Sequence, residues 1–172
     1  ALTNFERLKN SKKYEESYPY YITAVYFLDK RYDDVLSYAI PILNSTHQKN
    51  ETEMLRIVAA SYFAKADYPN SIKYYTQFQE RDNGKTQNTQ DSYQIGYAYY
   101  KTGNYAKTTV ELEKMVDKSD VYSQNGNYTL GDAFLKLNNK QSARNAFLVA
   151  SKLSFDKQLQ EDALYQFAKL SY

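Results

Sequence analysis

The chain has 172 residues, of which 24% are charged, and its formal net charge at pH 7 is +2. A charge this small creates no basic field, so we expect neither nucleic acid nor an anionic membrane as a partner. No apolar run reaches the length of a membrane span, and the absence of cysteine excludes disulfides and thiolate metal sites.

The predicted elements, taken in chain order, are helices that repeat one pattern. The opening ALTNFERL has apolar residues at the spacing of the second helix of a helix pair. Four stretches then follow, each with a small residue, an aromatic three residues later, a turn and a further helix. The small residues, 36, 37 and 35 residues apart, are Thr23, Ala59, Gly96 and Gly131. The closing EDALYQFAKLSY predicts one more first helix, with Ala168 in the small position.

The glycines in this pattern predict two different structures. Gly96 lies inside a helix, where glycine costs about 0.5–1 kcal/mol relative to alanine, so we expect a partner helix to approach closely there. Gly103 predicts a helix end in the left-handed conformation. Ala66 and Asn138 stand at the same place in their units; asparagine tolerates this conformation, whereas alanine adopts it poorly.

Aromatic residues occupy two fixed positions in the pattern. One set follows the small residue by three and is expected in the core of each helix pair: Tyr26, Tyr62, Tyr99 and Phe134. The other set is expected to open the second helices: Tyr32, Tyr68 and Tyr105.

These units resemble tetratricopeptide repeats, which are helix–turn–helix motifs of about 34 residues. The third unit carries the resemblance most fully, with Ile95 and Gly96 in the Leu-Gly positions, then Tyr99, Gly103 and Tyr105. The consensus Trp and the terminal Pro are absent. The resemblance implies an all-α superhelical solenoid of antiparallel helix pairs, with about four full repeats and a half-repeat at each end.

The predicted organisation is a single repeat domain over residues 1–172, expected to be a piece of a longer chain. Its approximate units are 1–15 (partial), 16–50, 51–87, 88–122, 123–156 and 157–172 (partial). Two polar stretches, 44–53 and 79–90, are expected as loops between units. The long, degenerate units are similar to those of bacterial cell-envelope proteins of this family. That similarity implies a periplasmic or outer-membrane-associated location, with the cytoplasm as the alternative.

Catalytic chemistry has no local signature in this sequence. The single histidine, His47, stands in a polar stretch without a partner nearby, and a solvated loop residue is the simpler interpretation. No phosphate loop or calcium loop is present. We therefore expect a protein that is not an enzyme and that uses no metal or cofactor.

The resemblance implies that a protein or peptide partner binds the concave face formed by the first helices. Its groove positions, carried onto this sequence, are Tyr20, Phe27, Arg56, Phe63, Tyr93, Tyr97, Tyr100, Lys101, Tyr128, Asp132 and Lys136. The prediction is a non-enzymatic interaction scaffold. Two alternatives stay open: a structural spacer or self-association module of a larger cell-envelope protein, in which self-association would use the end helices, and a carbohydrate-binding module whose tyrosines stack on sugars. The tyrosine rings could also serve only to fill the space between repeats.

Overall fold

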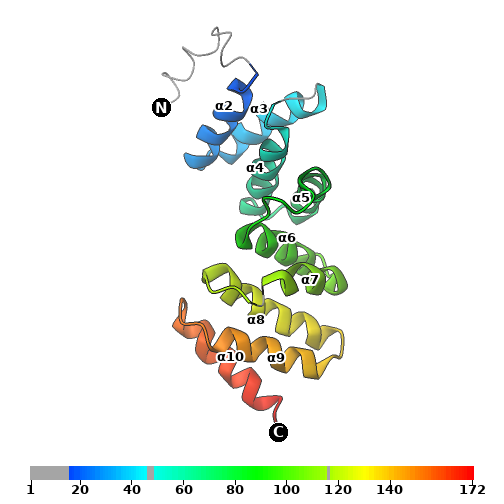
Figure 1. The fold of residues 1–172 in the computed structure, drawn as a ribbon, viewed down its shortest axis with the longest axis vertical. Coiled ribbons are helices and arrows are strands. Elements are labelled where there is room, and N and C mark those ends of the chain that lie inside the picture. Colours follow the sequence, from blue (N-terminus) through cyan, green and yellow to red (C-terminus); the bar gives the residue numbers. More distant parts are fainter. Residues whose placement is uncertain (1–15, 46–48, 116) are drawn as a thin grey trace. The chain divides into compact units, whose positions relative to one another are not determined.

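The described part of the chain, residues 16–45, 49–115 and 117–172 of a computed structural model, is all α-helical. Figure 1 shows the helices following one another along the chain as hairpins. They are α2 (Tyr18–Leu28), α3 (Tyr32–Ser45), α4 (Glu51–Ala64), α5 (Tyr68–Asp82), α6 (Thr89–Lys101), α7 (Tyr105–Leu112), the 3₁₀ turn η1 (Glu113–Met115), α8 (Val121–Lys136), α9 (Lys140–Ser151) and α10 (Lys157–Lys169).

The two helices of a pair run antiparallel, as their side-chain contacts show. In α4 and α5 the contacting residue moves back along α5 as it advances along α4. The pairs are the Glu51–Arg81 ion pair at 2.6 Å, the stacked rings of Tyr62 and Tyr74 at 5.5 Å, and the rings of Phe63 and Tyr68 at 5.9 Å. The predicted antiparallel helix pairs are therefore confirmed.

Successive pairs stack in a fixed way within each half of the chain. The contacts divide the chain between Thr86 and Gln87 into two compact halves. In the N-terminal half α4 packs on both α2 and α3; in the C-terminal half α8 packs on both α6 and α7, and α10 on both α8 and α9. Within the halves, α4, α8 and α10 thus each cover both helices of the pair before them. The division falls beside the expected boundary between units 51–87 and 88–122, and the single domain over 1–172 stays a prediction.

Four hairpin turns share one backbone conformation. The residues at positive φ are Lys30 (57°), Ala66 (58°), Gly103 (79°) and Asn138 (58°). In each turn the next backbone N–H donates to the carbonyl of the aromatic residue five positions earlier, at 2.8–3.0 Å, which is the Schellman arrangement. The expected helix ends at Gly103 and Asn138 are confirmed, and the poor preference of alanine did not prevent the same conformation at Ala66.

The second helices begin two residues later, because an N-cap follows the left-handed residue at once. Asp67, Asn104 and Asn139 each accept a hydrogen bond from the backbone N–H three residues on, at 3.1–3.2 Å. Helices α5 and α7 accordingly begin at Tyr68 and Tyr105, and α3 begins at Tyr32, all as predicted.

The small residues of the first helices lie where the second helix approaches. A Cβ added at Gly96 would lie 2.4 Å from Leu112 Cδ2, and one added at Gly131 would lie 2.8 Å from the Phe147 ring. Leu112 and Phe147 are almost fully buried. The close approach expected at Gly96 is therefore confirmed.

The aromatic residues expected in the core are only partly buried there. Tyr99 is buried, whereas Tyr26, Tyr62 and Phe134 are half-buried at the edge of their helix pairs. Tyr26 and Tyr62 lie against Tyr38 and Tyr74 of the second helices. The rings do face the partner helix, but three of the four lie at the edge of the core, because a ring of this size extends past the helix pair.

Polar side chains are part of the core of the C-terminal half. Gln124 of α8 is fully buried, and its Nε2 donates to the carbonyls of Leu153 and Asp156 at 2.8 and 2.9 Å. Its Oε1 accepts from the Asp156 backbone N–H at 2.8 Å. One amide therefore satisfies three backbone groups of the connection between α9 and α10, which a helix end would otherwise leave unpaired.

The two expected loops are shorter than predicted. Helix α3 continues to Ser45 and α4 begins at Glu51, while α5 continues to Asp82 and α6 begins at Thr89. Several of their polar residues, such as Glu80 and Arg81, lie exposed at helix ends, so polarity alone overstated the loops. The partial unit 1–15 and His47 lie outside the described residues.

Candidate functional site

Two first helices, α6 and α8, form the face on which the C-terminal groove positions were predicted. Near their starts Thr89 Oγ1 donates to Asp120 Oδ2, and near their ends Tyr100 Oη donates to Asp132 Oδ2, both at 2.5 Å. The two bonds join residues 31 and 32 positions apart, so the helices run parallel and in register. Both ends of this face are therefore fixed by side-chain hydrogen bonds.

A groove lies along this face and brings together six of the predicted residues. Its volume is about 480 Å³. The predicted residues that line it, together with Asp132, are Tyr93, Tyr97, Tyr100, Tyr128 and Lys136. All the tyrosines among them are half-buried, so part of each ring faces the groove. The size is in the range of about 300–1,000 Å³ that is usual for ligand sites.

A row of tyrosine rings runs along α6. The ring centroids are 5.6 Å apart between Tyr93 and Tyr97, and 6.1 Å apart between Tyr97 and Tyr100. Tyr122 of α8 lies 6.0 Å from Tyr93, and Tyr105 of α7 lies 5.7 Å from Tyr100. These spacings are those of aromatic pairs that stabilise one another. We call these five residues the tyrosine row; its central three rings line the groove.

The environment of the groove raises the pKa of two of its phenols, Tyr100 and Tyr128. The hydrogen bond to the Asp132 carboxylate, together with burial, raises the pKa of Tyr100 far above its usual range. Burial, and then the charges of Asp162 and Asp132, raise the pKa of Tyr128. Protonated phenols donate and accept hydrogen bonds, so the groove offers both functions beside its ring faces. The ammonium of Lys101, which is exposed, lies 5.9 Å from the Tyr97 ring.

Lys101 does not line this groove, and the remaining predicted residues belong to the N-terminal half and do not line it either. Phe27 and Phe63 pack edge-on against Tyr32 and Tyr68, the first residues of the following helices, at 5.8 and 5.9 Å. The structure thus gives these two rings a packing contact at a hairpin turn.

Tyr20 and Arg56, the other two predicted residues of this half, also have close neighbours. Tyr20 lies 5.4 Å from the Tyr21 ring. Arg56 forms an ion pair with Glu53 at 2.5 Å, and its guanidinium lies 5.9 Å from the Phe78 ring.

Two groove residues were missed from the sequence, Asn125 and Thr129 of α8. Both stand on the helix face of Asp132 and Lys136, at the i, i+4, i+7 and i+11 spacing that defines one side of a helix. That spacing was available in the sequence. Both were missed because small polar residues on an exposed face resemble ordinary solvated positions.

No candidate metal site is found in the described ranges 16–45, 49–115 and 117–172. No cluster of three or more His, Asp or Glu side chains there is placed to hold a metal ion. None of the helices in the same ranges combines the length and apolarity that a bilayer-spanning helix needs.

A solved structure with the same arrangement of helix pairs is the chain named "MamA MSR-1 C2". It matches 92% of this chain and 95% of its own length, with a TM-score of 0.63 and 16% sequence identity. MamA is a tetratricopeptide-repeat protein from magnetotactic bacteria. This chain has the tetratricopeptide-repeat fold. At this identity the similarity shows the fold alone, and neither a protein-family model nor a curated protein matches the sequence.

The structural similarity names neither a partner nor a binding face. Stacked helix pairs of this kind present long surfaces built from neighbouring repeats. On this chain, the C-terminal half offers such a surface with a groove already formed on it.

Proposed function

We propose that the chain is a non-enzymatic scaffold that binds an extended segment of a partner protein in the groove between α6 and α8. The observation that carries the proposal is the convergence of Tyr93, Tyr97, Tyr100 and Tyr128 on one groove with hydrogen-bonding groups beside them. Tyrosine is enriched in the few residues that dominate binding energy at protein interfaces.

The groove offers suitable chemistry for a polypeptide backbone. Asn125 and Thr129 supply amide and hydroxyl groups along α8, and the tyrosine rings supply flat apolar surface opposite them. An extended segment could place its backbone amides against the polar groups and alternate side chains against the rings. Since the hydrogen bonds of Thr89 to Asp120 and of Tyr100 to Asp132 already fix the face, little ordering would accompany binding.

The test compares two matched double variants of the whole chain. Tyr93→Ala with Tyr97→Ala removes two rings from the groove. Tyr165→Ala with Tyr172→Ala removes two tyrosines of the same half that are 65% and 109% exposed and lie outside the groove. Partners captured by the parent chain are identified, and tiled peptides from them are titrated by fluorescence anisotropy.

The groove variant is expected to bind such a peptide about thirtyfold or more weakly than the parent chain, because it loses two contacts worth about 1 kcal/mol or more each. The control variant is expected to bind as the parent does. If the parent chain, the groove variant and the control variant bind the peptide with equal affinity, the groove is not the binding site. No captured partner would favour the spacer alternative, and heat on mixing with glycans, lost in the groove variant, would favour carbohydrate binding. The periplasmic or outer-membrane location stays a prediction.

A further inference from the structure

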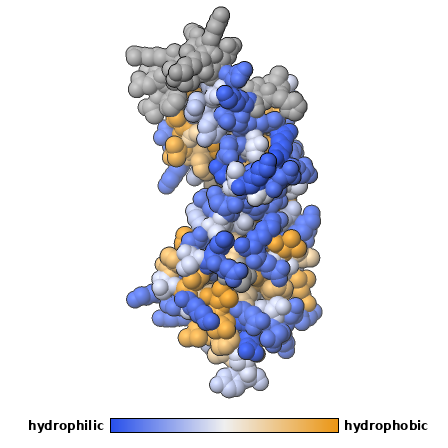
Figure 2. Space-filling view, viewed as in Figure 1, coloured by the Kyte–Doolittle hydropathy of each residue, from blue (hydrophilic) through white to orange (hydrophobic). Residues whose placement is uncertain are grey.

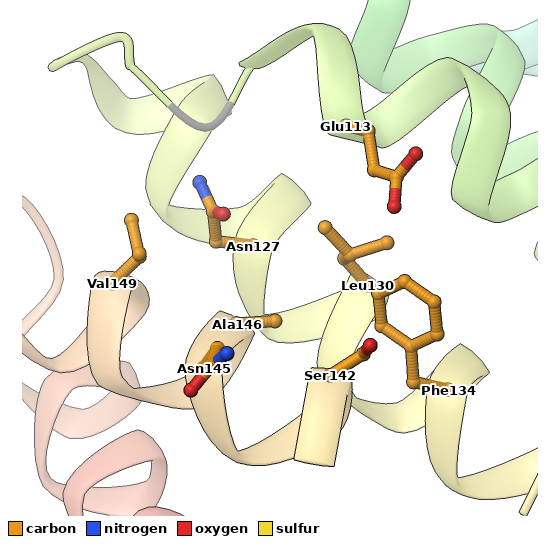
Figure 3. A pocket seen from close by; sticks show the side chains of 8 residues that line it. All are labelled: Glu113, Asn127, Leu130, Phe134, Ser142, Asn145, Ala146 and Val149. Atoms are coloured by element: carbon orange, nitrogen blue, oxygen red, sulfur yellow. The ribbon is translucent and has the colours of Figure 1, made fainter. Parts of the chain in front are cut away.

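A second hollow in the C-terminal half lies on the other side of α8. It is a pocket of about 200 Å³ between η1, α8 and α9 (Figure 3). The residues of α8 that line it are Asn127, Leu130 and Phe134, whereas those that line the groove are Asn125, Tyr128, Thr129, Asp132 and Lys136. At about 100° per residue the two sets lie about 180° apart on the helix. The pocket is therefore separate from the proposed partner groove.

Asn127 gives the pocket an unsatisfied hydrogen-bond acceptor. The residue is fully buried, and its Nδ2 donates to the Ser123 carbonyl at 2.8 Å. Its Oδ1 has no hydrogen-bond partner among the described residues. A buried amide oxygen without a donor is costly, and native structures rarely leave one. Because an amide oxygen can only accept, the group that would satisfy it must donate.

Glu113 gives the same pocket a negative charge. It is the single charged residue in the lining and comes from η1, the tight turn that ends α7. The cation next to it in sequence, Lys114, forms its ion pair with Glu111 at 2.6 Å. No ion pair of Glu113 is found within the described residues, and its side chain is exposed at the pocket mouth. An anion beside an unsatisfied acceptor favours a positively charged donor.

The rest of the lining is suited to a short aliphatic stem. Leu130 and Phe134 of α8 and Ala146 and Val149 of α9 supply apolar surface. In Figure 3 Glu113 reaches the pocket from the η1 side, while Ser142 and Asn145 reach it from α9 on the other side. The volume is below the range of about 300–1,000 Å³ for drug-sized ligands, so the occupant is small.

We infer that this pocket binds a primary alkylammonium group, with the ammonium between Glu113 and Asn127 and the alkyl stem against Leu130 and Val149. This chemistry has two sources, the side chain of a lysine in a polypeptide and a free alkylamine. The inference goes beyond the proposed function, and because the two sites lie on opposite sides of α8, either can fail while the other stands.

The experiment is a titration of the ¹⁵N-labelled whole chain, followed by NMR. The probes are n-butylamine and, as a neutral molecule of the same stem, n-butanol. The test variant is Glu113→Gln, which keeps the shape of an exposed side chain, and the matched control is Glu161→Gln, an exposed acid of α10 outside the pocket. A second test variant, Val149→Phe, narrows the pocket without altering a charge.

Butylamine is expected to shift the Asn127 side-chain amide and the pocket residues at lower concentrations than butanol does. Glu113→Gln is expected to weaken the binding of butylamine at least tenfold, and Val149→Phe is expected to abolish it. Glu161→Gln is expected to leave the affinity for butylamine unchanged. If butylamine shifts no resonance of the pocket residues, the inference is overturned and water remains as the occupant of the pocket. Equal binding of butanol, or equal weakening by Glu161→Gln, would also overturn it.

The two sources are separated by a third probe, Nα-acetyl-lysine methylamide. Binding at least as tight as that of butylamine assigns the pocket to a lysine side chain. Binding at least tenfold weaker assigns it to a free amine, because the peptide groups are then excluded. Either result retains the ammonium site.

Discussion

Alanine at Gly96 is the substitution whose effect the packing determines most directly. Its Cβ would lie 2.4 Å from Leu112 Cδ2 and 2.6 Å from Leu112 Cγ, whereas carbon atoms in contact lie about 3.5–4.0 Å apart. Leu112 would have to move by about 1 Å, and it is fully buried against Met115 and Leu130. Such overpacking costs about 1–3 kcal/mol, and alanine recovers about 0.5–1 kcal/mol inside a helix. Mid-range values leave a net loss of about 1 kcal/mol.

The assay is urea unfolding of the whole chain followed by far-UV circular dichroism, with the midpoint compared at unchanged slope. Gly126→Ala is the matched control, because its Cβ would approach the Sδ and Cε of Met115 closely, at 2.9 and 3.1 Å, and would meet Leu112 Cδ2 only at an ordinary contact distance of 3.7 Å. The two Met115 atoms end a flexible side chain, so we expect a change within about 0.5 kcal/mol.

The same substitution in a chain that lacks the Leu112 side chain separates steric overlap from other causes of a stability loss. In a Leu112→Ala chain the overlapping atoms are gone, and Gly96→Ala is expected to stabilise by about 0.5–1 kcal/mol through helix propensity alone. The reasoning is refuted if Gly96→Ala stabilises the parent chain. It is equally refuted if the loss is the same with and without the Leu112 side chain.

Two further predictions concern a turn and a titration. Ala66→Gly is expected to raise the free energy of unfolding by about 0.5–1 kcal/mol, because φ at Ala66 is 58° and glycine adopts that conformation without steric cost; a lower urea midpoint would contradict this. Burial, and then the neighbouring Tyr18 and Tyr26, raise the pKa of Tyr38 to about 12. Its folded pKa thus exceeds the unfolded value of about 10, so this contribution is complete below pH 10 and is lost as the pH rises toward 12. In that window the free energy of unfolding of Tyr38→Phe, measured by urea unfolding, is expected to fall less steeply with pH than that of the parent chain. Equal slopes for the two proteins would contradict the assignment.

The repeat arrangement was predictable because steric rules act locally on it. A small residue at Gly96 or Gly131 and a left-handed residue at Gly103 or Asn138 each allow few backbone arrangements, so their spacing determines the helix pairs. The same conformation at Lys30 and Ala66 was less visible. Hydrogen bonds from the following N–H stabilise those turns although neither residue type favours the conformation.

The candidate site was only partly predictable, because helical periodicity places residues on a face and does not measure depth. It put Tyr93, Tyr97 and Tyr128 on the first-helix face, where the structure forms a groove. It could not show that Phe27 and Phe63 pack on the next helix start. The pocket beside Asn127 could not be predicted from the sequence, since it depends on how η1 and α9 pack against α8.

Gln124 has a mechanical consequence for the C-terminal half. Its buried amide joins α8 directly to the backbone on both sides of the connection before α10. A force applied to α10 therefore passes across to α8 through three hydrogen bonds loaded together, as well as along the covalent chain through α9. Under tension the last helix would not peel away by itself. It would detach with the connection that holds it, in a single step that begins when water reaches the amide of Gln124.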